Sequence, residues 1–246
     1  MKDIIKNKKS YDKAAEQYHK NLLDSKTNFW HRFIEKPAMT SILKDIVKNK
    51  TVLDLGCGSG IFTKKIFSMN ANSVTGLDIS GNLIEIAKKE NPKIKFYVGN
   101  AAKSPFKNSQ FNLVSSSLMV HYFKNLKPLF KEVSRILKKK GFFVFSMHHP
   151  IMEISGKLNV KGIKGSLLKP YFHNNKYLWT LHKKINLVSY HHTLENIINS
   201  LNDSGFVIER ILEPKASEKT KKINKKMYYR TNLRPSFLII KARKEK

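Results

Sequence analysis

The hydrophobic pattern along the chain changes period between residues 30 and 150. Apolar positions first recur at helical spacing from Phe33 to Ile46, with Pro37 as a predicted kink. From Thr51 on, short and almost continuous apolar runs alternate with amphipathic stretches, which is typical of parallel strands covered on both faces. Gly141 is expected to end the last of these helices. The predicted strands are 51–55, 73–77, 94–98, 111–116 and 142–146, and the predicted helices are 62–68, 81–90 and 126–137.

After Pro150 this alternation breaks. The segment up to Tyr190 is rich in aromatic residues, and its second half, 176–190, predicts a hairpin. So long an excursion is typical of a lid or binding element, and aromatics packed on the sheet edge are the alternative. A helix at 193–204 and strands at 206–212 and 237–242, separated by a basic loop, are predicted next. We expect one domain, 1–246, with an N-terminal helical cap at 1–48 and a lid-like insertion at about 150–190.

Composition narrows the class of protein. A chain of 246 residues with 41% hydrophobic residues can bury a substantial core. The single cysteine, Cys57, can form neither an internal disulfide nor a cysteine zinc cage. No apolar run approaches the roughly 18 residues of a membrane span, and the first residues lack the apolar block of a signal peptide. We therefore expect a cytoplasmic protein with no membrane partner and no metal.

The net charge of +29 has two interpretations. Clustered lysine and arginine bind phosphates, yet only six of the 47 basic residues are arginine. Lysines occur throughout helices and loops, and we favour charge spread over solvated faces. The densest cluster, Lys219 to Lys226 with Arg230 and Arg234 beyond it, keeps a nucleic-acid surface as the alternative.

The sequence VLDLGCGSG, from Val52 to Gly60, carries the main functional signal. It is a predicted strand that ends near Asp54 and turns through Gly56, Gly58 and Gly60 into a helix, so that the backbone can approach a ligand closely. Asp78 lies 22 residues beyond Gly56 at the end of the next strand, where a carboxylate can bind ribose hydroxyls.

The details of this turn separate ligand classes. A dinucleotide motif requires glycine where the chain has Ile61, and Asp54 would repel a pyrophosphate. A phosphate-binding loop requires Gly-Lys-Ser/Thr, which is not present at Gly60. Asp54 instead suits a ligand that carries positive charge near the loop, as S-adenosylmethionine does with its ammonium and sulfonium groups. A nicotinamide enzyme remains a minor alternative.

These residues resemble the class I S-adenosylmethionine-dependent methyltransferases, over about Tyr11 to Lys241. The resemblance implies a Rossmann-like doubly wound α/β fold with a seven-stranded, mostly parallel sheet, an antiparallel C-terminal strand and helices on both faces. It also implies that the loop wraps the methionine part of the donor, that Asp78 holds the ribose, and that Ile79 packs on the adenine. The implied cofactor-binding residues are Tyr11, Tyr18, Asp54, Gly56, Cys57, Gly58, Gly60, Asp78, Ile79, Asn100, Ala101 and Ser116, and Ser117 is implied to line the methyl-transfer cleft beside Ser116.

A narrower resemblance links the chain to a group of small cytoplasmic methyltransferases of type 11, usually regarded as acting on small molecules. It rests on segments 30–39, 117–123, 146–150, 190–206, 212–215 and 234–242. The family often has aspartate at positions 100 and 112, where this chain has Asn100 and Asn112. An amide oxygen can still accept a hydrogen bond from the adenine amino group.

Histidines near the expected cleft are the candidates for a general base. His121 follows the fourth predicted strand, and His148 and His149 follow the fifth, at the edge where parallel sheets bind ligands. We select His121 and His149 as candidate catalytic residues, with hydrogen bonding to a lid as the alternative role. Cys57 is interpreted as a small residue at the turn because no partner that would stabilise a thiolate is visible.

The favoured function is methyl transfer from S-adenosylmethionine to a small molecule, leaving S-adenosylhomocysteine. One alternative is an RNA or protein methyltransferase that docks its substrate on 219–234. The other is a non-catalytic module that only binds the cofactor.

Overall fold

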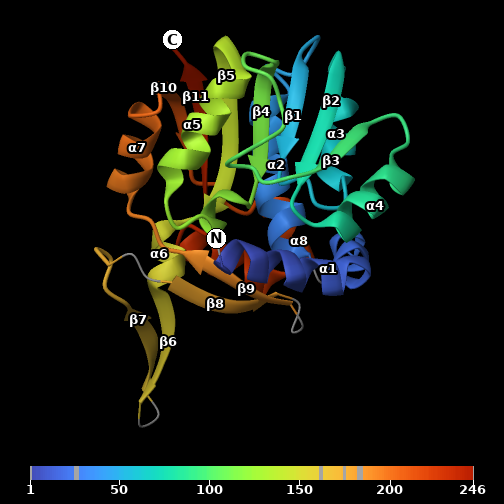
Figure 1. Ribbon diagram of the computed structural model, residues 1–246. Coiled ribbons are helices and arrows are strands. Elements are labelled where there is room, and N and C mark those ends of the chain that lie inside the picture. Colours follow the sequence, from blue (N-terminus) through green and yellow to red (C-terminus); the bar gives the residue numbers. More distant parts are fainter. Residues whose placement is uncertain (1, 25–27, 161–162, 174–175, 182–184, 246) are drawn as a thin grey trace.

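The computed structural model describes residues 2–24, 28–160, 163–173, 176–181 and 185–245. Its main feature is a seven-stranded sheet with the order β10-β11-β5-β4-β1-β2-β3 (Figure 1). The strands are β1 (Thr51–Leu55), β2 (Ser73–Asp78), β3 (Lys95–Val98), β4 (Phe111–Ser117), β5 (Leu137–His148), β10 (Phe206–Leu212) and β11 (Phe237–Lys244). Strands β1 to β5 pair in parallel, whereas β11 is antiparallel to both β5 and β10. The predicted fold class is confirmed.

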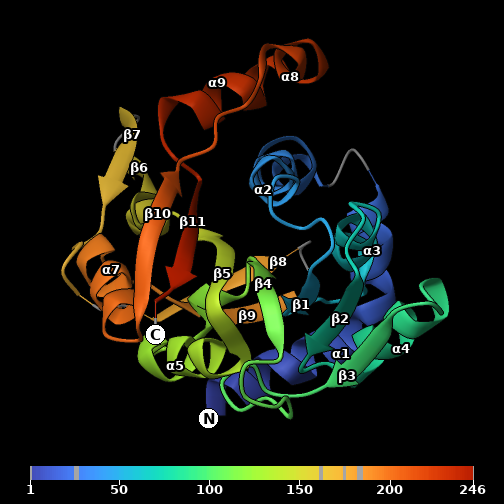
Figure 2. The ribbon, with the colours of Figure 1, turned by 90° about the horizontal axis from the view of Figure 1, so that it is seen from above.

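Helices cover both faces of the sheet (Figure 2). On one face, α2 and α3 bury Met39, Leu43 and Ile66 against the sheet, and on the other, α5 and α7 bury Phe130 and Leu201. The helices of the described residues are α1 (Lys2–Leu23), α2 (Lys36–Leu43), α3 (Ile61–Phe67), α4 (Gly81–Glu90), α5 (Leu126–Ile136), α6 (Pro150–Ile154), α7 (Leu194–Asn202), α8 (Glu218–Ile223) and α9 (Lys225–Leu233), with short η1 (His31–Glu35) and η2 (Val120–Tyr122).

The predicted role of Gly141 is wrong. Helix α5 already ends at Ile136, because Leu137 takes an extended conformation and pairs with Phe111 as the first residue of β5. Gly141 lies inside β5, where a Cβ atom would approach the carbonyl oxygen of Lys138 to 2.8 Å. The glycine therefore serves close backbone packing within the strand and not the end of a helix.

The basic segment between β10 and β11 is also more ordered than the predicted loop. It contains α8 and α9, and the side chain of Asn224 caps α9 by accepting a hydrogen bond from Met227 N. Arg230 lies over the Trp30 ring at 5.6 Å, which joins α9 to the region of η1. Many lysines of the cluster remain exposed on the two helices.

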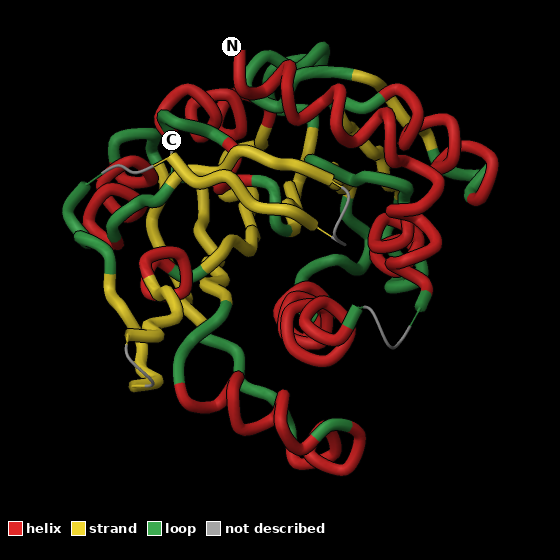
Figure 3. The backbone as a smooth tube through the Cα atoms, turned by 90° about the horizontal axis from the view of Figure 1, so that it is seen from below, coloured by secondary structure: helices red, strands yellow, loops and turns green. Residues whose placement is uncertain are grey.

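The segment between β5 and α7 forms α6 and two hairpins. Strands β6 (Ser155–Val160) and β7 (Ile163–Leu168) form an arm that projects away from the sheet (Figure 1). The predicted hairpin is present as β8 (Lys176–Leu181) and β9 (Ile185–Tyr190), which lie across the end of the sheet beside α1 (Figure 3). Residues 161–162, 174–175 and 182–184 of the predicted insertion, and 25–27 of the predicted N-terminal cap, lie outside the described residues.

Within the described ranges, no helix is long and apolar enough to cross a membrane.

Candidate active site

A cavity of about 860 Å³ lies at the carboxyl ends of the parallel strands. Its lining includes the loops after β1, β2 and β4, together with residues of α1, α2, α3 and β8. Eleven of the predicted site residues line it, namely Tyr11, Tyr18, Asp54, Gly56, Cys57, Gly58, Asp78, Ile79, Asn100, Ala101 and His121. The sheet topology brings these distant segments together because parallel strands end at the same edge.

The glycine loop has the backbone that its sequence predicts. Gly56, Gly58 and Gly60 have φ values of +78°, +55° and +79°, which side chains with a Cβ atom rarely adopt. A Cβ atom on Gly58 would lie 3.8 Å from the Tyr18 ring, and both residues line the cavity. The loop therefore leaves open a space that a ligand can occupy against bare backbone.

Asp78 is held at the end of β2 by two backbone donors. Gly58 N donates to Oδ2 and Ser80 N donates to Oδ1, each at 2.9 Å. Each carboxylate oxygen keeps a further lone pair, so Asp78 has acceptor capacity left for two ribose hydroxyls. Burial raises the pKa of Asp78 although these two hydrogen bonds act in the opposite direction. The geometry fits the ribose of S-adenosylmethionine.

Asp54 is a nearly fully buried carboxylate at the cavity wall. Thr63 Oγ1 donates to its Oδ2 at 2.7 Å, and burial raises its pKa to about 6. A positively charged group in the cavity would favour the ionised form. The neighbouring Cys57 is also buried, and its pKa lies well above the ordinary value because of burial and of the carboxylates of Asp78 and Asp54. A thiol in this environment is not a nucleophile.

The N-terminal helix brings tyrosines to the cavity. The rings of Tyr11 and Tyr18 meet edge to face at 5.2 Å, and Tyr11 Oη is hydrogen-bonded to Tyr122 Oη at 2.8 Å. At the far side of the loop after β3, Asn100 Oδ1 accepts a hydrogen bond from Ala102 N at 2.9 Å. The Asn100 side chain thus organises its own turn, and its oxygen keeps one lone pair for a ligand.

Aromatic rings surround His121. Its ring stacks on that of His148 at 4.0 Å with an angle of 18°, and Trp179 of β8 meets His148 edge to face at 4.6 Å. His121 is fully buried, and neither ring nitrogen has a hydrogen-bond partner among the described residues. Burial, followed by the charge of His148, holds the pKa of His121 well below its ordinary value. The imidazole is therefore neutral at pH 7.

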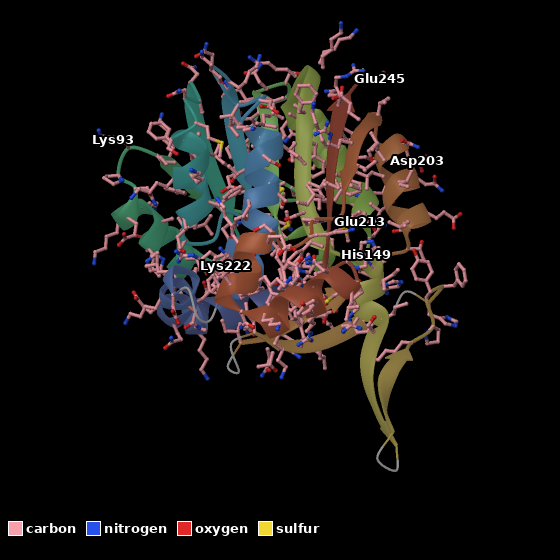
Figure 4. The ribbon with its side chains drawn as sticks, turned by 180° about the vertical axis from the view of Figure 1, so that it is seen from behind. Lys93, His149, Asp203, Glu213, Lys222 and Glu245 are labelled. Atoms are coloured by element: carbon pink, nitrogen blue, oxygen red, sulfur yellow. The ribbon has the colours of Figure 1, made fainter. Side chains whose placement is uncertain are left out.

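Three predicted residues, His149, Ser116 and Gly60, do not line the cavity. His149 Nδ1 accepts from Ile151 N and caps α6, so its Nε2 carries the proton and donates to Glu213 at 2.7 Å (Figure 4). Ser116 is fully buried within β4, and alternation along that strand turns the adjacent Ser117 toward the cavity instead. Gly60 shapes the turn and is the N-cap residue of α3.

Glu35 and Lys36 are cavity-side residues that the sequence pattern did not reveal. The fully buried Glu35 accepts hydrogen bonds from Ser117 Oγ at 2.8 Å and from Ser146 Oγ at 2.6 Å. Lys36 Nζ donates to Ser117 Oγ at 2.5 Å and lines the cavity.

The π-helical turn η1 explains why periodicity missed them. Lys36 N donates to His31 O, five residues back, so the turn holds one residue more than an α-helical turn and shifts Glu35 inward. Pro37 follows and has no N–H to donate, which accounts for the break in the α-helical pattern. In the sequence, the polar residues and the proline of HRFIEKP indicate an irregular turn at this place.

The part of the chain that the structure describes contains no group of three or more His, Cys, Asp or Glu side chains that could hold a metal ion.

Comparison with known proteins agrees with this geometry. Residues 53–145 match a methyltransferase domain family. An uncharacterized protein of Haemophilus influenzae is 30% identical over 238 residues, which cover 87% of this chain and 88% of that protein. A demethylmenaquinone methyltransferase of Chlorobaculum parvum is 32% identical over 114 residues, so the chain spans about half the length of that relative, 46%.

Solved structures give the same result over nearly the whole fold. The crystal structure of an S-adenosylmethionine dependent methyltransferase from Mesorhizobium loti superimposes with a TM-score of 0.74 and 28% identity. The match covers 85% of this chain and 97% of that one. With the glycine loop, Asp78 and the sheet order already in place, the chain belongs to the S-adenosylmethionine-dependent methyltransferases of class I.

Proposed function

We propose that the protein transfers the methyl group of S-adenosylmethionine to a small molecule that binds in the same cavity as the donor. The main support for this proposal is that α1 and the β8–β9 hairpin together cover the cavity, and we call these two elements the cover. Helix α1 and the β8–β9 hairpin lie across the open end of the sheet and contribute Tyr11, Tyr18 and Trp179 to the cavity wall (Figure 3). A cavity of about 860 Å³ beneath such a cover suits a donor and a compact acceptor.

The cover is held by buried polar contacts. Asn7 Nδ2 donates to Val188 O, and Val188 N donates to Asn7 Oδ1, both at 2.8 Å, so one side chain pairs with the free edge of β9 like a neighbouring strand. Near the middle of α1, Asp12 accepts a hydrogen bond from Ser80 Oγ at 2.6 Å. A polymer substrate would have to displace these contacts, whereas a small molecule can react beneath them.

We assign the donor site to the glycine loop, with Asp78 on the ribose, Ile79, Asn100 and Ala101 at the adenine, and Asp54 near the positively charged methionine end. When bound, S-adenosylmethionine supplies a methyl group on a sulfonium centre. The residues of the chain contribute by placing the acceptor in line with this group and by excluding water. The curated relative named demethylmenaquinone methyltransferase takes a small-molecule acceptor by its name, which supports the same class here.

The basic helices α8 and α9 favour a second candidate, an RNA or protein acceptor. Lys219, Lys222, Lys225 and Lys226 are exposed there and form the densest positive cluster. Binding of a polyanion to such a surface weakens steeply as the salt concentration increases, because the release of counterions into a concentrated salt solution gains less entropy. Salt dependence therefore separates the two candidates.

The experiment is transfer of labelled methyl groups from S-adenosylmethionine into a cell extract that is then separated into metabolites, RNA and protein. We expect label in the metabolite fraction at low and at moderate salt. Label in RNA or protein that disappears as salt rises would overturn the proposal in favour of the second candidate. The Asp78→Ala variant should lose donor binding and transfer, and Asp203→Ala, on the exposed end of α7, should retain both.

A further inference from the structure

The part of the cavity around His121 is built from rings. Five residues form it, and we call them the ring wall: Tyr11, His121, Tyr122, His148 and Trp179, all of which line the cavity. The His121 ring lies 4.4 Å from the Tyr122 ring and 6.3 Å from the Trp179 ring, centroid to centroid. Rigid flat walls of this kind favour a flat ligand, because aromatic rings stack or meet edge to face at these separations.

Two members of the ring wall carry buried polar atoms without partners. Within the described structure, no hydrogen bond reaches Nδ1 or Nε2 of His121 or Nε1 of Trp179. Leaving such atoms buried and unpaired is costly, and each exception calls for an explanation. A ligand that brings a matching polar group into the ring wall would satisfy them.

The chemistry of the two side chains specifies that group. The indole Nε1 of Trp179 can only donate, and the neutral His121 has one nitrogen that accepts. A hydroxyl group can accept from Trp179 and donate to His121 at once. An arylamine nitrogen fits less well, because its lone pair is delocalised into the ring and accepts poorly. The two rings meet edge to face with their centroids 6.3 Å apart, so both belong to the same corner of the cavity.

Charge around the ring wall disfavours an ionic acceptor. The charge of Asp78 contributes to raising the pKa of Tyr11 and of Tyr122, and Glu153 Oε1 lies 3.7 Å from His148 Nδ1. An anion bound at the ring wall would therefore meet two carboxylates. A cation would instead be repelled by the sulfonium of the donor. The basic residues that line the cavity belong to η1, α2 and α3, not to the elements of the ring wall.

From these observations we infer that the acceptor is a flat, uncharged compound with a hydroxyl group on a conjugated ring, bound against the ring wall with its hydroxyl toward Trp179 and His121. This inference rests on the proposed function and names its acceptor class. The hydroxyl oxygen forms a bond to the methyl carbon while the carbon–sulfur bond breaks and its electron pair stays on sulfur. The hydroxyl proton passes to the accepting nitrogen of His121.

The charge balance of this step explains how so weak a base can act. Before transfer the cavity holds a sulfonium and a neutral imidazole, and afterwards it holds a neutral thioether and an imidazolium. The total charge is unchanged, and the sulfonium that opposed protonation of His121 has gone. The oxygen also becomes strongly acidic as its bond to the methyl group forms, so the proton leaves readily.

The test uses the purified full chain loaded with S-adenosylhomocysteine and titrated by calorimetry with three probes. These are 2-naphthol, which is flat and neutral, decahydro-2-naphthol, which has the hydroxyl without the flat ring, and 2-naphthoate, which is flat and anionic. We expect 2-naphthol to bind about tenfold more tightly than either other probe. Equal binding of the three, or no binding of 2-naphthol, would overturn the inference.

Two variants locate the site. His121→Phe and Trp179→Phe keep a ring and remove the polar atoms, and each should weaken 2-naphthol about tenfold while S-adenosylhomocysteine binds as before. His173→Phe, which changes an exposed histidine that does not line the cavity, is the control. Unchanged 2-naphthol affinity in both ring-wall variants would refute the assignment. Since donor binding and transfer into metabolites are measured separately, a failure here is distinct from a failure of the proposed function.

Discussion

Asp54 is the residue from which we expect the clearest pH dependence. Its folded-state pKa of about 6 exceeds the value of 3.8 for an unperturbed aspartate, so the folded protein binds this proton more tightly than the unfolded chain does. The corresponding stability is fully present below pH 3.8 and is lost as the pH rises through 6. Above that pH, the donor-free protein carries a buried charge that the hydrogen bond from Thr63 and the charge of Lys36 offset only in part.

The Asp54→Asn variant tests this directly. Without donor at pH 7.5, we expect its free energy of unfolding in urea to exceed that of the wild type by roughly 1–3 kcal/mol, and near pH 4 we expect no gain. Donor affinity should fall in the same variant, because the positive end of the ligand loses its carboxylate. Asp203→Asn, an exposed aspartate, serves as the control, and a pH-independent difference for Asp54→Asn would contradict the assigned burial effect.

Substitution of Gly58 is expected to change both the stability of the protein and its affinity for the donor. With φ at +55° and the Tyr18 ring 3.8 Å from where a Cβ atom would lie, Gly58→Ala should cost about 1 kcal/mol of stability and weaken the donor at least about tenfold. Gly81→Ala is a matched control, because φ there is ordinary and no atom lies within 4 Å of its Cβ position. Thermal unfolding and donor calorimetry on both variants check this, and equal donor affinities would contradict it.

At the residue scale, the functional residues at the ends of β1 and β2 could be predicted from the sequence. Residues whose role depends on the direction of the side chain could not. Gly58 and Asp78 could be placed because strand, turn and spacing define a backbone geometry. The sequence analysis selected His149, whereas His148 lines the cavity, since adjacent residues at a strand end face opposite ways and only the fold determines which one faces it. Glu35 was hidden because one extra residue in η1 changes the face that it occupies.

At the scale of elements, Asn7 joins α1 to β9. Replacing it by leucine, a side chain of similar shape, removes both hydrogen bonds to Val188 and leaves that backbone unpaired. We expect a loss of about 2 kcal/mol and faster amide exchange in α1, measured by hydrogen–deuterium exchange with and without donor. Lys9→Ala, on the same helix, should change neither, and unchanged exchange in Asn7→Leu would refute the role of this contact.

The regular elements were more predictable than their connections. Strands such as β5 and β11 contain continuous apolar runs, at Phe142–Phe145 and Phe237–Ile240, and α4 begins directly after Ser80, whose side chain caps the helix by accepting a hydrogen bond from Leu83 N. The sequence pattern predicts a loop where α8 and α9 lie, because their lysine-rich sequence has little apolar periodicity, and the two helices are supported by contacts such as Arg230 with Trp30. Tertiary contacts of this kind are not visible in a local pattern.

At the scale of the whole molecule, the charge of +29 opposes folding through self-repulsion. Raising the salt concentration to about 0.15 M screens charges more than about 8 Å apart, so thermal stability should increase while methyl transfer to a neutral acceptor changes less than about twofold. Differential scanning calorimetry and the transfer assay over the same salt series measure the two effects. A parallel loss of transfer would instead point to a polyanionic acceptor.

The overall topology could be predicted because alternating strands and helices admit few arrangements. The antiparallel β11 and the cover over the cavity depend on contacts between distant parts of the chain, and the resemblance to a family supplied the first of these. The β6–β7 arm has no counterpart in the hydrophobic pattern that we interpreted.

The contact between Asn7 and Val188 also imposes an order in time. The two residues lie 181 positions apart, so α1 leaves the ribosome long before the strand that completes its hydrogen bonds is made. The glycine loop and the first strands can form while α1 has no partner on β9. A nascent chain would thus acquire the floor of its donor site early, and it could enclose a ligand only once β9 has emerged.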